Sequence, residues 1–392
     1  MKRSLLLVVL LISCGMISAG NEADSLLTVA ADSVAEMQPE SVADTVVSIP
    51  PKRTFFQKFT HQMGNMIRAF SERDSNYIEP QKYPFTTMIQ HTENYQYTRL
   101  KLSSGNTLTL SPDVIFKIGP YFGWQWIFLG ATIDLKHFFK SPEGTYIDLS
   151  LYSNQIGLDF YYIDNGDNFR IRHLRMGGDI DTSPLNGVIA QGLSERTRGF
   201  NLYYIINHRK FSYPAAFGQT TRQKRTAGSL MVGTGYAHHQ FRLNSDRFYE
   251  MIFNYIPEFE DFIENVDDGE SKRRIMNEMQ LSSVDYRSFT VSCGWGHNFV
   301  LARYLLIAGS LMVGASYNVT DEEYREGISR VFRNMSLDNV SLDATARMGF
   351  VFNNDRWYAG FSGIMHNYNY STSLFRSNNF FGTINVYGGV FF

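Results

Sequence analysis

The sequence predicts an all-β fold, a single antiparallel transmembrane β-barrel of about 12 strands (10–14), with an N-terminal amphipathic helix before it. Three observations lead to this prediction. Side chains alternate in character with a period of two through much of the chain, which is typical of β-strands. Aromatic residues make up 15% of the chain and charged residues only 19%, a low charge content for a water-soluble surface. Finally, short and long connections alternate, as in bacterial membrane barrels.

Charge and hydropathy exclude two other classes of protein. The formal net charge is −2, and removal of an N-terminal signal containing Lys2 and Arg3 would make it more negative, so we expect no nucleic-acid partner. The mean hydropathy is −0.22. No segment after the signal has the ~18 consecutive apolar residues of a transmembrane helix. A barrel fits these values, because only alternate residues of its strands face lipid.

The first 92 residues are predicted to lie before the barrel, which we assign to 93–392. Residues 1–20 resemble a signal peptide cleaved near Gly20, which places the protein in a bacterial envelope. Alternatively, residues 11–14 resemble a lipobox, and Cys14 would then be lipidated. Residues 21–53 have the composition of a flexible linker, and 54–92 of an amphipathic helix and a lead-in. That helix either docks on the barrel or lies on the periplasmic membrane surface.

Twelve strands follow from the alternation, an even number as in bacterial single-chain barrels. The stretch 146–163 changes phase near Asn154, which suggests a β-bulge within one strand. The predicted strands lie near 94–104, 113–122, 125–135, 146–163, 168–175, 197–208, 227–243, 283–300, 303–318, 338–352, 356–370 and 379–392.

The last strand sets the predicted topology. From Phe380 to Phe392, one face is apolar apart from glycines, and the other mixes aromatic and polar residues. The first face is expected to contact lipid. Phe392 resembles the terminal aromatic signal of Gram-negative outer-membrane barrels, so we expect it to act in membrane insertion. The barrel-assembly machinery would then be a partner of the C-terminal strand.

A periplasmic Phe392 assigns every connection to one side of the membrane. It places 123–124, 164–167, 301–303 and 353–355 in the periplasm, and 136–145, 176–196, 244–282, 319–337 and 371–378 outside. Short periplasmic turns and long outer loops are usual in such barrels. The exception is 209–225, which is long but periplasmic, so it either enters the barrel mouth or hides a hairpin. The loop 244–282 has its own apolar stripe and is expected to cap the mouth or enter the lumen.

Two stretches resemble a known family. One is DSNYIEP at 74–80, and the other runs from RGFNLYYI at 198–205 through KFSYPAAF at 210–217 to AGS at 227–229. Together they resemble an uncharacterised bacterial outer-membrane β-barrel family, the domain of unknown function 4421, over roughly 70–392. The resemblance implies a barrel in the outer membrane and a structured 209–225 segment. It implies no catalytic residue, because the family has no established activity.

Polar residues on the predicted inward faces are the candidate lumen residues. They either fill a small lumen with paired charges or line a path for a small solute. The first interpretation is favoured because Tyr121, Tyr203 and Tyr387 also point inward. The candidates are Lys117, Asp134, Asp148, Asp159, Asn201, Asp343, Arg347 and Asn385.

Catalytic and metal sites have weaker support. His238 and His239 are adjacent and so face opposite sides of a strand, and we expect no metal site and no cofactor. The alternative is a phospholipase-like or omptin-like surface hydrolase. Ser292, His297 and Asn298 are close in sequence, but His297 lies on the other face. An omptin-like site would gather its residues at the outer rim, and the candidates are Asp179, Asp181, His173 and His239.

The sequence therefore predicts a non-enzymatic envelope protein: a narrow channel, a hydrophobic-solute conduit, or a structural barrel bound to a partner protein. Outer-membrane lipids are the other expected partners. A basic cluster suggests contact with phosphate groups at the periplasmic surface of the outer membrane, although a solvated periplasmic turn is the simpler interpretation. Its members are Arg209, Lys210, Arg222, Lys224 and Arg225.

Overall fold

A computed structural model describes residues 73–392, apart from 103–104, 125–126, 131–132, 135–143, 167, 176–179, 260–282, 321–338 and 372–374. The contacts divide the chain into two units, Met1–His61 and Gln62–Phe392, and the second contains all described residues. The predicted signal peptide, linker and amphipathic helix therefore lie outside the described residues. Within the described part, no helix has the length and hydropathy needed to cross a membrane.

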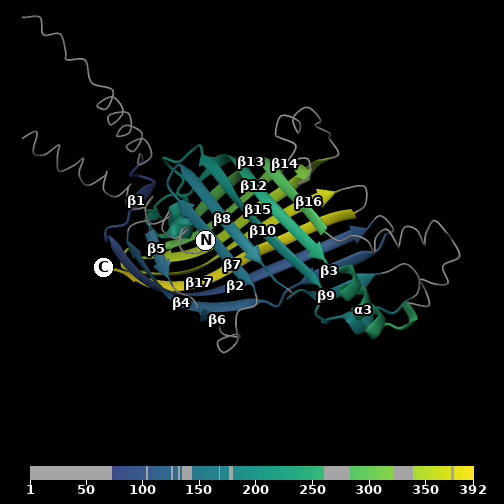
Figure 1. Cartoon of the computed structure of the whole chain (residues 1–392). Coiled ribbons are helices and arrows are strands. Elements are labelled where there is room, and N and C mark those ends of the chain that lie inside the picture. Colours follow the sequence, from purple (N-terminus) through teal and green to yellow (C-terminus); the bar gives the residue numbers. More distant parts are fainter. Residues whose placement is uncertain are drawn as a thin grey trace, which may run out of the picture. The chain divides into compact units, whose positions relative to one another are not determined.

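The core of the fold is an antiparallel sheet with twelve strands along its main path, in the order β5-β4-β2-β17-β16-β15-β14-β13-β12-β10-β8-β7 (Figure 1). This confirms the predicted all-β class and antiparallel arrangement. Strand β17 pairs with β2, which brings the C-terminal strand beside the first long strand. The bounds are β2 Phe85–Leu102, β4 Ile115–Trp124, β5 Ile127–Gly130, β7 Thr145–Tyr152, β8 Ile156–Asp164, β10 Leu193–Ile205, β12 Ala227–Leu243, β13 Ser283–Ala302, β14 Leu305–Thr320, β15 Val340–Asn353, β16 Trp357–Ser371 and β17 Phe375–Phe391.

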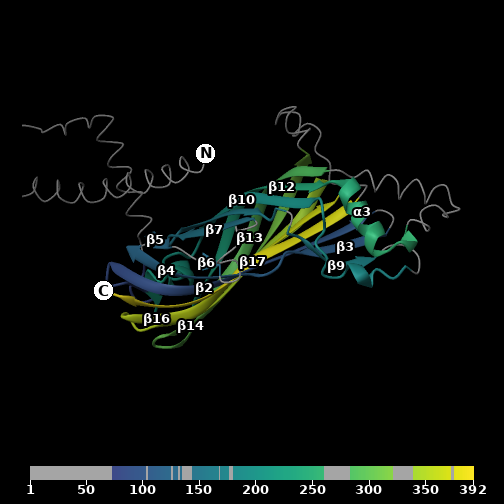
Figure 2. The same ribbon diagram turned by 60° about the horizontal axis from the view of Figure 1, so that its bottom comes forward.

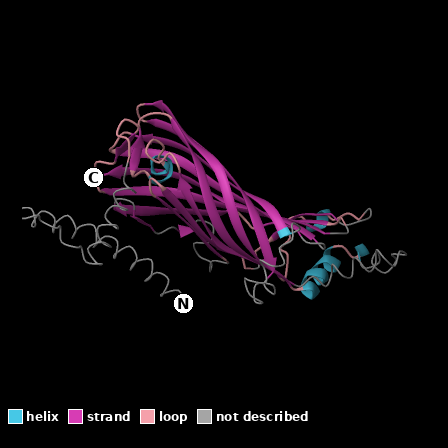
Figure 3. Cartoon of the chain, turned by 90° about the horizontal axis from the view of Figure 1, so that it is seen from above, coloured by secondary structure: helices cyan, strands magenta, loops and turns pink. Residues whose placement is uncertain are grey.

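The sheet is curled, because side chains from strands far apart in its order touch one another. Arg347 of β15 forms an ion pair with Asp159 of β8. Thr383 Oγ1 of β17 donates to a carboxylate oxygen of Asp148 on β7 at 2.9 Å. A flat sheet would hold these strands far apart, since neighbouring strands are about 4.8 Å apart. The sheet therefore has a concave interior and a convex outer face, as Figure 3 also shows.

Alternation along each strand separates these two faces. On β17, Phe381 and Thr383 are buried in the interior, whereas Ile384 and Val386 are 38% and 53% exposed on the convex face. This is the division predicted for the last strand. Within the described residues, the sheet path ends at β5 on one side and β7 on the other. The short strand β6 (Ile133–Asp134) pairs with β4 in the same register as β5, so β5 and β6 together occupy the predicted strand 125–135.

Two strand predictions were wrong, and the errors cancel in the count. The stretch 146–163 is a hairpin of β7 and β8, not one bulged strand. Its turn is closed by Ser153, whose hydroxyl oxygen accepts from the Ile156 N–H at 2.9 Å. The predicted strand 168–175 exists as β9 (Arg170–Arg175), but it pairs with the short strand β3 (Thr107–Ser111) outside the twelve-strand path.

The extra hairpin also corrects the predicted topology. Asp164 at the end of β8 pairs with Arg196 near the start of β10. The 164–167 turn therefore lies at the sheet end opposite Phe392, not at the same end as predicted. Strand β2 also begins at Phe85, earlier than expected, and the backbones of Phe85 and Phe392 exchange two hydrogen bonds, of 3.2 and 3.0 Å.

The two ends of the sheet are covered differently. We call the end that holds Phe392 the plug end, because the connection between β10 and β12 enters the interior there. We call the opposite end the cap end. At the cap end, β3, β9, the 3-10 helix η1 (Ser183–Leu185) and α3 (Ser245–Tyr255) pack around an apolar cluster. Figure 2 shows β3, β9 and α3 together at this end. The Asn244 side chain caps α3 by accepting from the Arg247 N–H at 3.2 Å. Phe248, Met251 and Ile252 of α3 are buried there, so the described part of the 244–282 loop caps this end.

Candidate functional site

The connection between β10 and β12 fills the interior at the plug end. We call residues 206–226 the plug segment; it contains the π-helix η2 (Pro214–Gly218) and β11 (Thr221–Gln223). The helix η2 contacts β7, β14 and β15 from inside the curl. Pro214 suits the start of a helix because its fixed φ matches the helical value. Of the two alternatives left open for 209–225, the structure shows entry into the interior of the curled sheet and no additional hairpin.

Apolar side chains hold the plug segment against the strands. Phe211 and Tyr213 are 1% and 0% exposed, and they pack with Met231 and Met312. The ring of Phe217 lies 5.9 Å from that of Tyr152 on β7. Each large side chain removed from water in this way stabilises the packed state by about 1.5–3 kcal/mol. The plug segment is therefore part of the protein core.

Three strands also form hydrogen bonds with the plug segment. The Tyr213 hydroxyl donates to Ser310 Oγ of β14 at 2.5 Å. Gln219 Nε2 donates to the Tyr387 hydroxyl of β17 at 3.2 Å, and Gln219 Oε1 accepts from Asn353 of β15 at 3.2 Å. Because these groups are buried, a displaced plug would leave them without partners at a cost of about 1–3 kcal/mol each.

A small polar core closes the plug segment on itself and on β13. Gln223 Oε1 accepts from the Ser212 N–H at 3.0 Å and from Asn298 Nδ2 at 3.1 Å. Asn298 Nδ2 also donates to the Ser212 carbonyl at 2.8 Å. Near this contact β13 carries Gly296, where an added Cβ would lie 2.8 Å from the Phe211 ring. Glycine is needed at this position because the plug approaches the strand closely.

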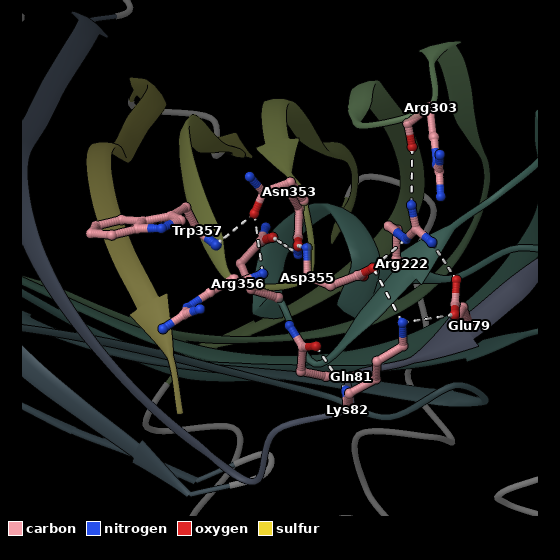
Figure 4. A network of polar contacts seen from close by, with 11 residues as sticks. Glu79, Gln81, Lys82, Arg222, Arg303, Asn353, Asp355, Arg356 and Trp357 are labelled. Atoms are coloured by element: carbon pink, nitrogen blue, oxygen red, sulfur yellow. Dashed lines mark hydrogen bonds and ion pairs between the residues drawn. The ribbon is translucent and has the colours of Figure 1, made fainter.

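An ion-pair network joins the plug segment to the chain before β2 and to the β15–β16 turn. Strand β1 (Ile78–Pro80) pairs with β11. Arg222 forms ion pairs with Glu79 and with Asp355, the latter at 3.1 Å, and donates to the Arg303 carbonyl at 3.2 Å (Figure 4). Lys82 Nζ lies 3.9 Å from Glu79 and 3.7 Å from Asp355. We call Glu79, Lys82, Arg222 and Asp355 the latch.

The charge of Arg222 has a direct effect within the latch. Its hydrogen bond to Glu79 holds the pKa of that carboxyl below its usual value of 4.5. Glu79 is therefore ionised at neutral pH, and the latch contains two carboxylates and two cations. The attraction between these opposite charges stabilises the pairing of β1 with β11.

The rest of the predicted basic cluster also contacts its own chain. Lys224 Nζ donates to the Ser75 carbonyl at 3.0 Å. Lys210 and Arg225 lie over the Tyr77 ring, 5.1 and 5.7 Å from its centre. The two stretches that carry the family resemblance therefore pack on each other. These cations have intramolecular partners, which weakens the hypothesis that they bind membrane phosphates.

A buried ion pair crosses the interior beyond the plug. Asp159 is 0% exposed, accepts from Ser150 Oγ at 2.7 Å and pairs with Arg347. The Arg347 guanidinium lies 5.0 Å from the Tyr203 ring and 5.8 Å from the ring of Tyr213 in the plug. Loss of one partner from such a pair costs about 3–5 kcal/mol, because an uncompensated charge stays buried.

The other predicted lumen residues have partners as well. Asp134 pairs with Lys117 through the backbone, and its side chain lies outside the described part. The contacts of the rest are Lys117 Nζ to the Tyr146 carbonyl (3.4 Å), Thr383 Oγ1 to Asp148 (2.9 Å), Asn201 Nδ2 to the Tyr368 hydroxyl (3.2 Å), the Asn369 N–H to Asp343 (2.9 Å) and Gln90 Nε2 to Asn385 (2.9 Å).

Ser292, His297 and Asn298 are not brought together on one face of the sheet. Asn298 binds the plug from the interior, whereas His297 packs against the exposed Phe299 of the convex face, with ring centres 4.2 Å apart. His239 is buried against Tyr286, with ring centres 4.8 Å apart. Asp179 lies outside the described residues. The described residues contain no group of three or more His, Cys, Asp or Glu side chains that could hold a metal ion.

Sequence reasoning missed the latch and the role of Gln219. Two signals were present: the resemblance included both 74–80 and 210–217, and Asn353, Asn354 and Asp355 formed a marked break between strands. Neither signal predicted that the two stretches meet, because their contact depends on the inward folding of the plug segment.

Residues 72–392 match the family DUF4421, a domain of unknown function. The chain belongs to this family. The comparison with curated proteins gave no match.

Several solved structures of outer-membrane proteins are similar to this chain. A mutant of the TodX monoaromatic hydrocarbon channel is 8% identical, covers 80% of this chain and 93% of its own, and has a TM-score of 0.23. The outer membrane protein OprG from Pseudomonas aeruginosa is 8% identical, with coverage of 80% and 98% and a TM-score of 0.22. A bacterial polysaccharide outer membrane secretin is 9% identical, with coverage of 79% and 98% and a TM-score of 0.26.

Proposed function

We propose that this DUF4421 protein is a closed transmembrane β-barrel of the bacterial outer membrane, with a non-enzymatic role in the envelope. Its lumen is sealed at rest by its own plug segment, so it acts as a structural, partner-binding barrel and not as an open channel. The observation that carries the proposal is the burial of the plug segment against β7, β14, β15 and β17. A solute path along the interior would need this segment to leave.

The convex face supports membrane insertion. Large apolar side chains exposed there occur on ten strands, and water-soluble monomers rarely expose such a continuous apolar surface. Lipid hydrocarbon would cover all of them at once, which no single partner surface would do. One member from each strand is Ile89, Phe122, Leu149, Leu202, Leu230, Val291, Leu311, Leu342, Met365 and Val386.

A contact between the two sides of the sheet path supports barrel closure. Lys117 Nζ of β4 donates to the Tyr146 carbonyl of β7 at 3.4 Å, although β4 lies near one end of the path and β7 at the other. Closure would remove both open strand edges, which cannot remain unpaired in lipid. We place Phe392 and the plug end in the periplasm and the cap end outside. The cleaved signal, the N-terminal helix and recognition by the assembly machinery belong to the same proposal.

Conductance in planar bilayers tests the sealed lumen. The full protein should give no discrete current steps. A variant carrying Tyr213→Ala and Gln219→Ala loses three hydrogen bonds between the plug segment and the strands and should give transient steps, whereas exposed Arg356→Ala should stay silent. Stable steps from the unaltered protein would contradict the sealed barrel. Turnover of phospholipid or peptide by the unaltered protein would contradict the non-enzymatic role.

A further inference from the structure

The convex face near the cap end carries three parallel rows of side chains on β8, β10, β12 and β13. The strand register places each row directly across these four strands. The row nearest the middle of the sheet is aromatic: Phe160, Phe200, Tyr236 and Phe289. The next row is Tyr162, Arg198, His238 and Arg287. The row nearest the cap is Asp164, Arg196, Gln240 and Asp285.

The aromatic row marks a change from apolar to polar surface. Tyr236 lies between Phe200 and Phe289, with ring centres 6.2 and 5.4 Å apart. One step toward the plug end, Leu202 and Val291 are 41% and 73% exposed. Transmembrane barrels carry girdles of aromatic residues where the hydrocarbon meets the headgroups. The next row, which contains Arg198 and Arg287, therefore falls at headgroup level in the proposed membrane orientation.

Arg198 is held in place within its row. Its Nε and Nη2 donate to His238 Nδ1 at 3.2 and 3.0 Å, and His238 Nε2 donates to Asp285 at 2.5 Å. The His238 ring is only 2% exposed, so its place between Arg198 and Asp285 is fixed by packing. Gln240 holds the other carboxylate oxygen of Asp285 at 2.7 Å. Arg198 itself is exposed, so a preoriented guanidinium faces outward.

Further cations surround Arg198. Arg196 donates two hydrogen bonds to one oxygen of Asp164, at 2.9 and 2.7 Å. Arg242 lies two positions beyond Gln240 on the same face of β12 and is exposed. With Arg287, this surface carries four guanidinium groups and two carboxylates, which gives it a net charge of +2. The charge favours an anionic group placed above the aromatic row.

We infer that this surface binds the phosphorylated headgroup of an outer-leaflet glycolipid. Phosphate oxygens would accept from Arg198 and Arg242, and the acyl chains would lie along Phe200, Tyr236 and Phe289. Arginines spread over neighbouring strands suit a headgroup that carries more than one phosphate on a rigid sugar unit. The single phosphodiester of a phospholipid would reach fewer of them. The inference rests on the proposed membrane location, which places the cap end at the outer leaflet.

Native mass spectrometry of the full protein in detergent, titrated with diphosphoryl lipid A, tests the inference. The double variant Arg198→Gln and Arg242→Gln should bind at least about tenfold more weakly, since two charge-assisted contacts are lost. Arg198→Lys should give a smaller loss, because it keeps the charge but not the planar fork. The matched control is Lys101→Gln with Arg175→Gln. It removes two exposed positive charges at the cap end that do not belong to the proposed lipid-binding surface. It should change affinity less than about twofold.

Three results would overturn the inference: equal binding by the double variant, equal binding of dephosphorylated lipid A, or equal competition by phosphatidylglycerol. The last result would indicate a general attraction for anionic lipid. Co-flotation with neutral phosphatidylcholine vesicles separates this inference from the proposed function. Failure to float contradicts membrane insertion itself, whereas flotation without a lipid A preference contradicts only the glycolipid site.

Discussion

The two ends of the sheet both carry clusters of basic residues, yet they use them in opposite ways. At the plug end, Arg222, Lys224 and Lys210 contact carboxylates, a carbonyl and an aromatic ring of their own chain. At the cap end, Arg198 and Arg242 sit on strands and face outward. The difference arises from the backbone that carries them, because the plug segment folds inward whereas strand alternation directs cap-end arginines to the convex face. The face of the sheet that a basic residue occupies therefore has to be known before the residue is assigned an external partner.

Among these predictions, the largest loss of stability should follow disruption of the Asp159–Arg347 ion pair, which spans the interior between these ends. Arg347→Ala leaves Asp159 charged and buried, so the free energy of unfolding in detergent should fall by about 3–5 kcal/mol. Denaturant titration followed by tryptophan fluorescence measures the loss. The double variant Asp159→Leu with Arg347→Met should recover most of it, because neither charge then remains. An unchanged midpoint for Arg347→Ala would show that the pair does not hold the interior together.

A second variant tests the plug end alone. Gly296→Ala places a methyl group 2.8 Å from the Phe211 ring, so the plug must shift and stability should fall by about 1–3 kcal/mol. The control is Gly388→Ala, where the nearest atom to an added Cβ is a carbonyl oxygen at 3.9 Å. The same denaturant titration compares the two. If both variants lose stability equally, the effect comes from glycine replacement in strands and not from the plug contact.

Loss of the latch should lower the global free energy of unfolding only slightly. Its main effect should be to loosen the segment before β2. Arg222→Gln removes the ion pairs to Glu79 and Asp355, and the free energy of unfolding should fall by about 1–2 kcal/mol. Hydrogen exchange should increase at Ile78–Pro80, whose backbone pairs with β11. Exposed Arg356→Gln is the charge-matched control. Unaltered exchange at β1 in the Arg222 variant would contradict the coupling between the latch and this strand.

Acid should weaken the plug end slightly. Arg222 lowers the pKa of Glu79 in the folded state below its usual 4.5, so this pair's contribution is fully present above about pH 4.5. It declines as the pH falls through the lower folded pKa. Because Glu79 is partly exposed, we expect under about 1 kcal/mol. Hydrogen exchange at β1 between pH 6 and pH 3 measures it, and Glu79→Gln should remove this part of the pH dependence. An identical pH response in both proteins would contradict it.

Sequence patterns gave wrong strand predictions where the structure depends on pairing between distant segments. The phase change near Asn154 fits both a bulge and a hairpin turn, and residues 153–155 contain no glycine or proline to mark the turn. Strand β9 has a strand pattern of its own, but only its pairing with β3 places it in the cap. These two ambiguities moved the 164–167 turn to the wrong end of the sheet. The total of twelve strands survived because one missed strand and one surplus strand compensated.

The sequence by itself determined which face most strand residues occupy. A period of two fixes the face of each side chain once the strand exists, and so Phe381 and Thr383 were predicted to face inward and Ile384 and Val386 outward. Tertiary structure alone decided what occupies the interior. The plug segment has no sustained period, and its place depends on contacts with strands up to about 170 positions away, such as Gln219 with Tyr387. Such contacts exist only in the curled sheet, so no local sequence pattern could predict them.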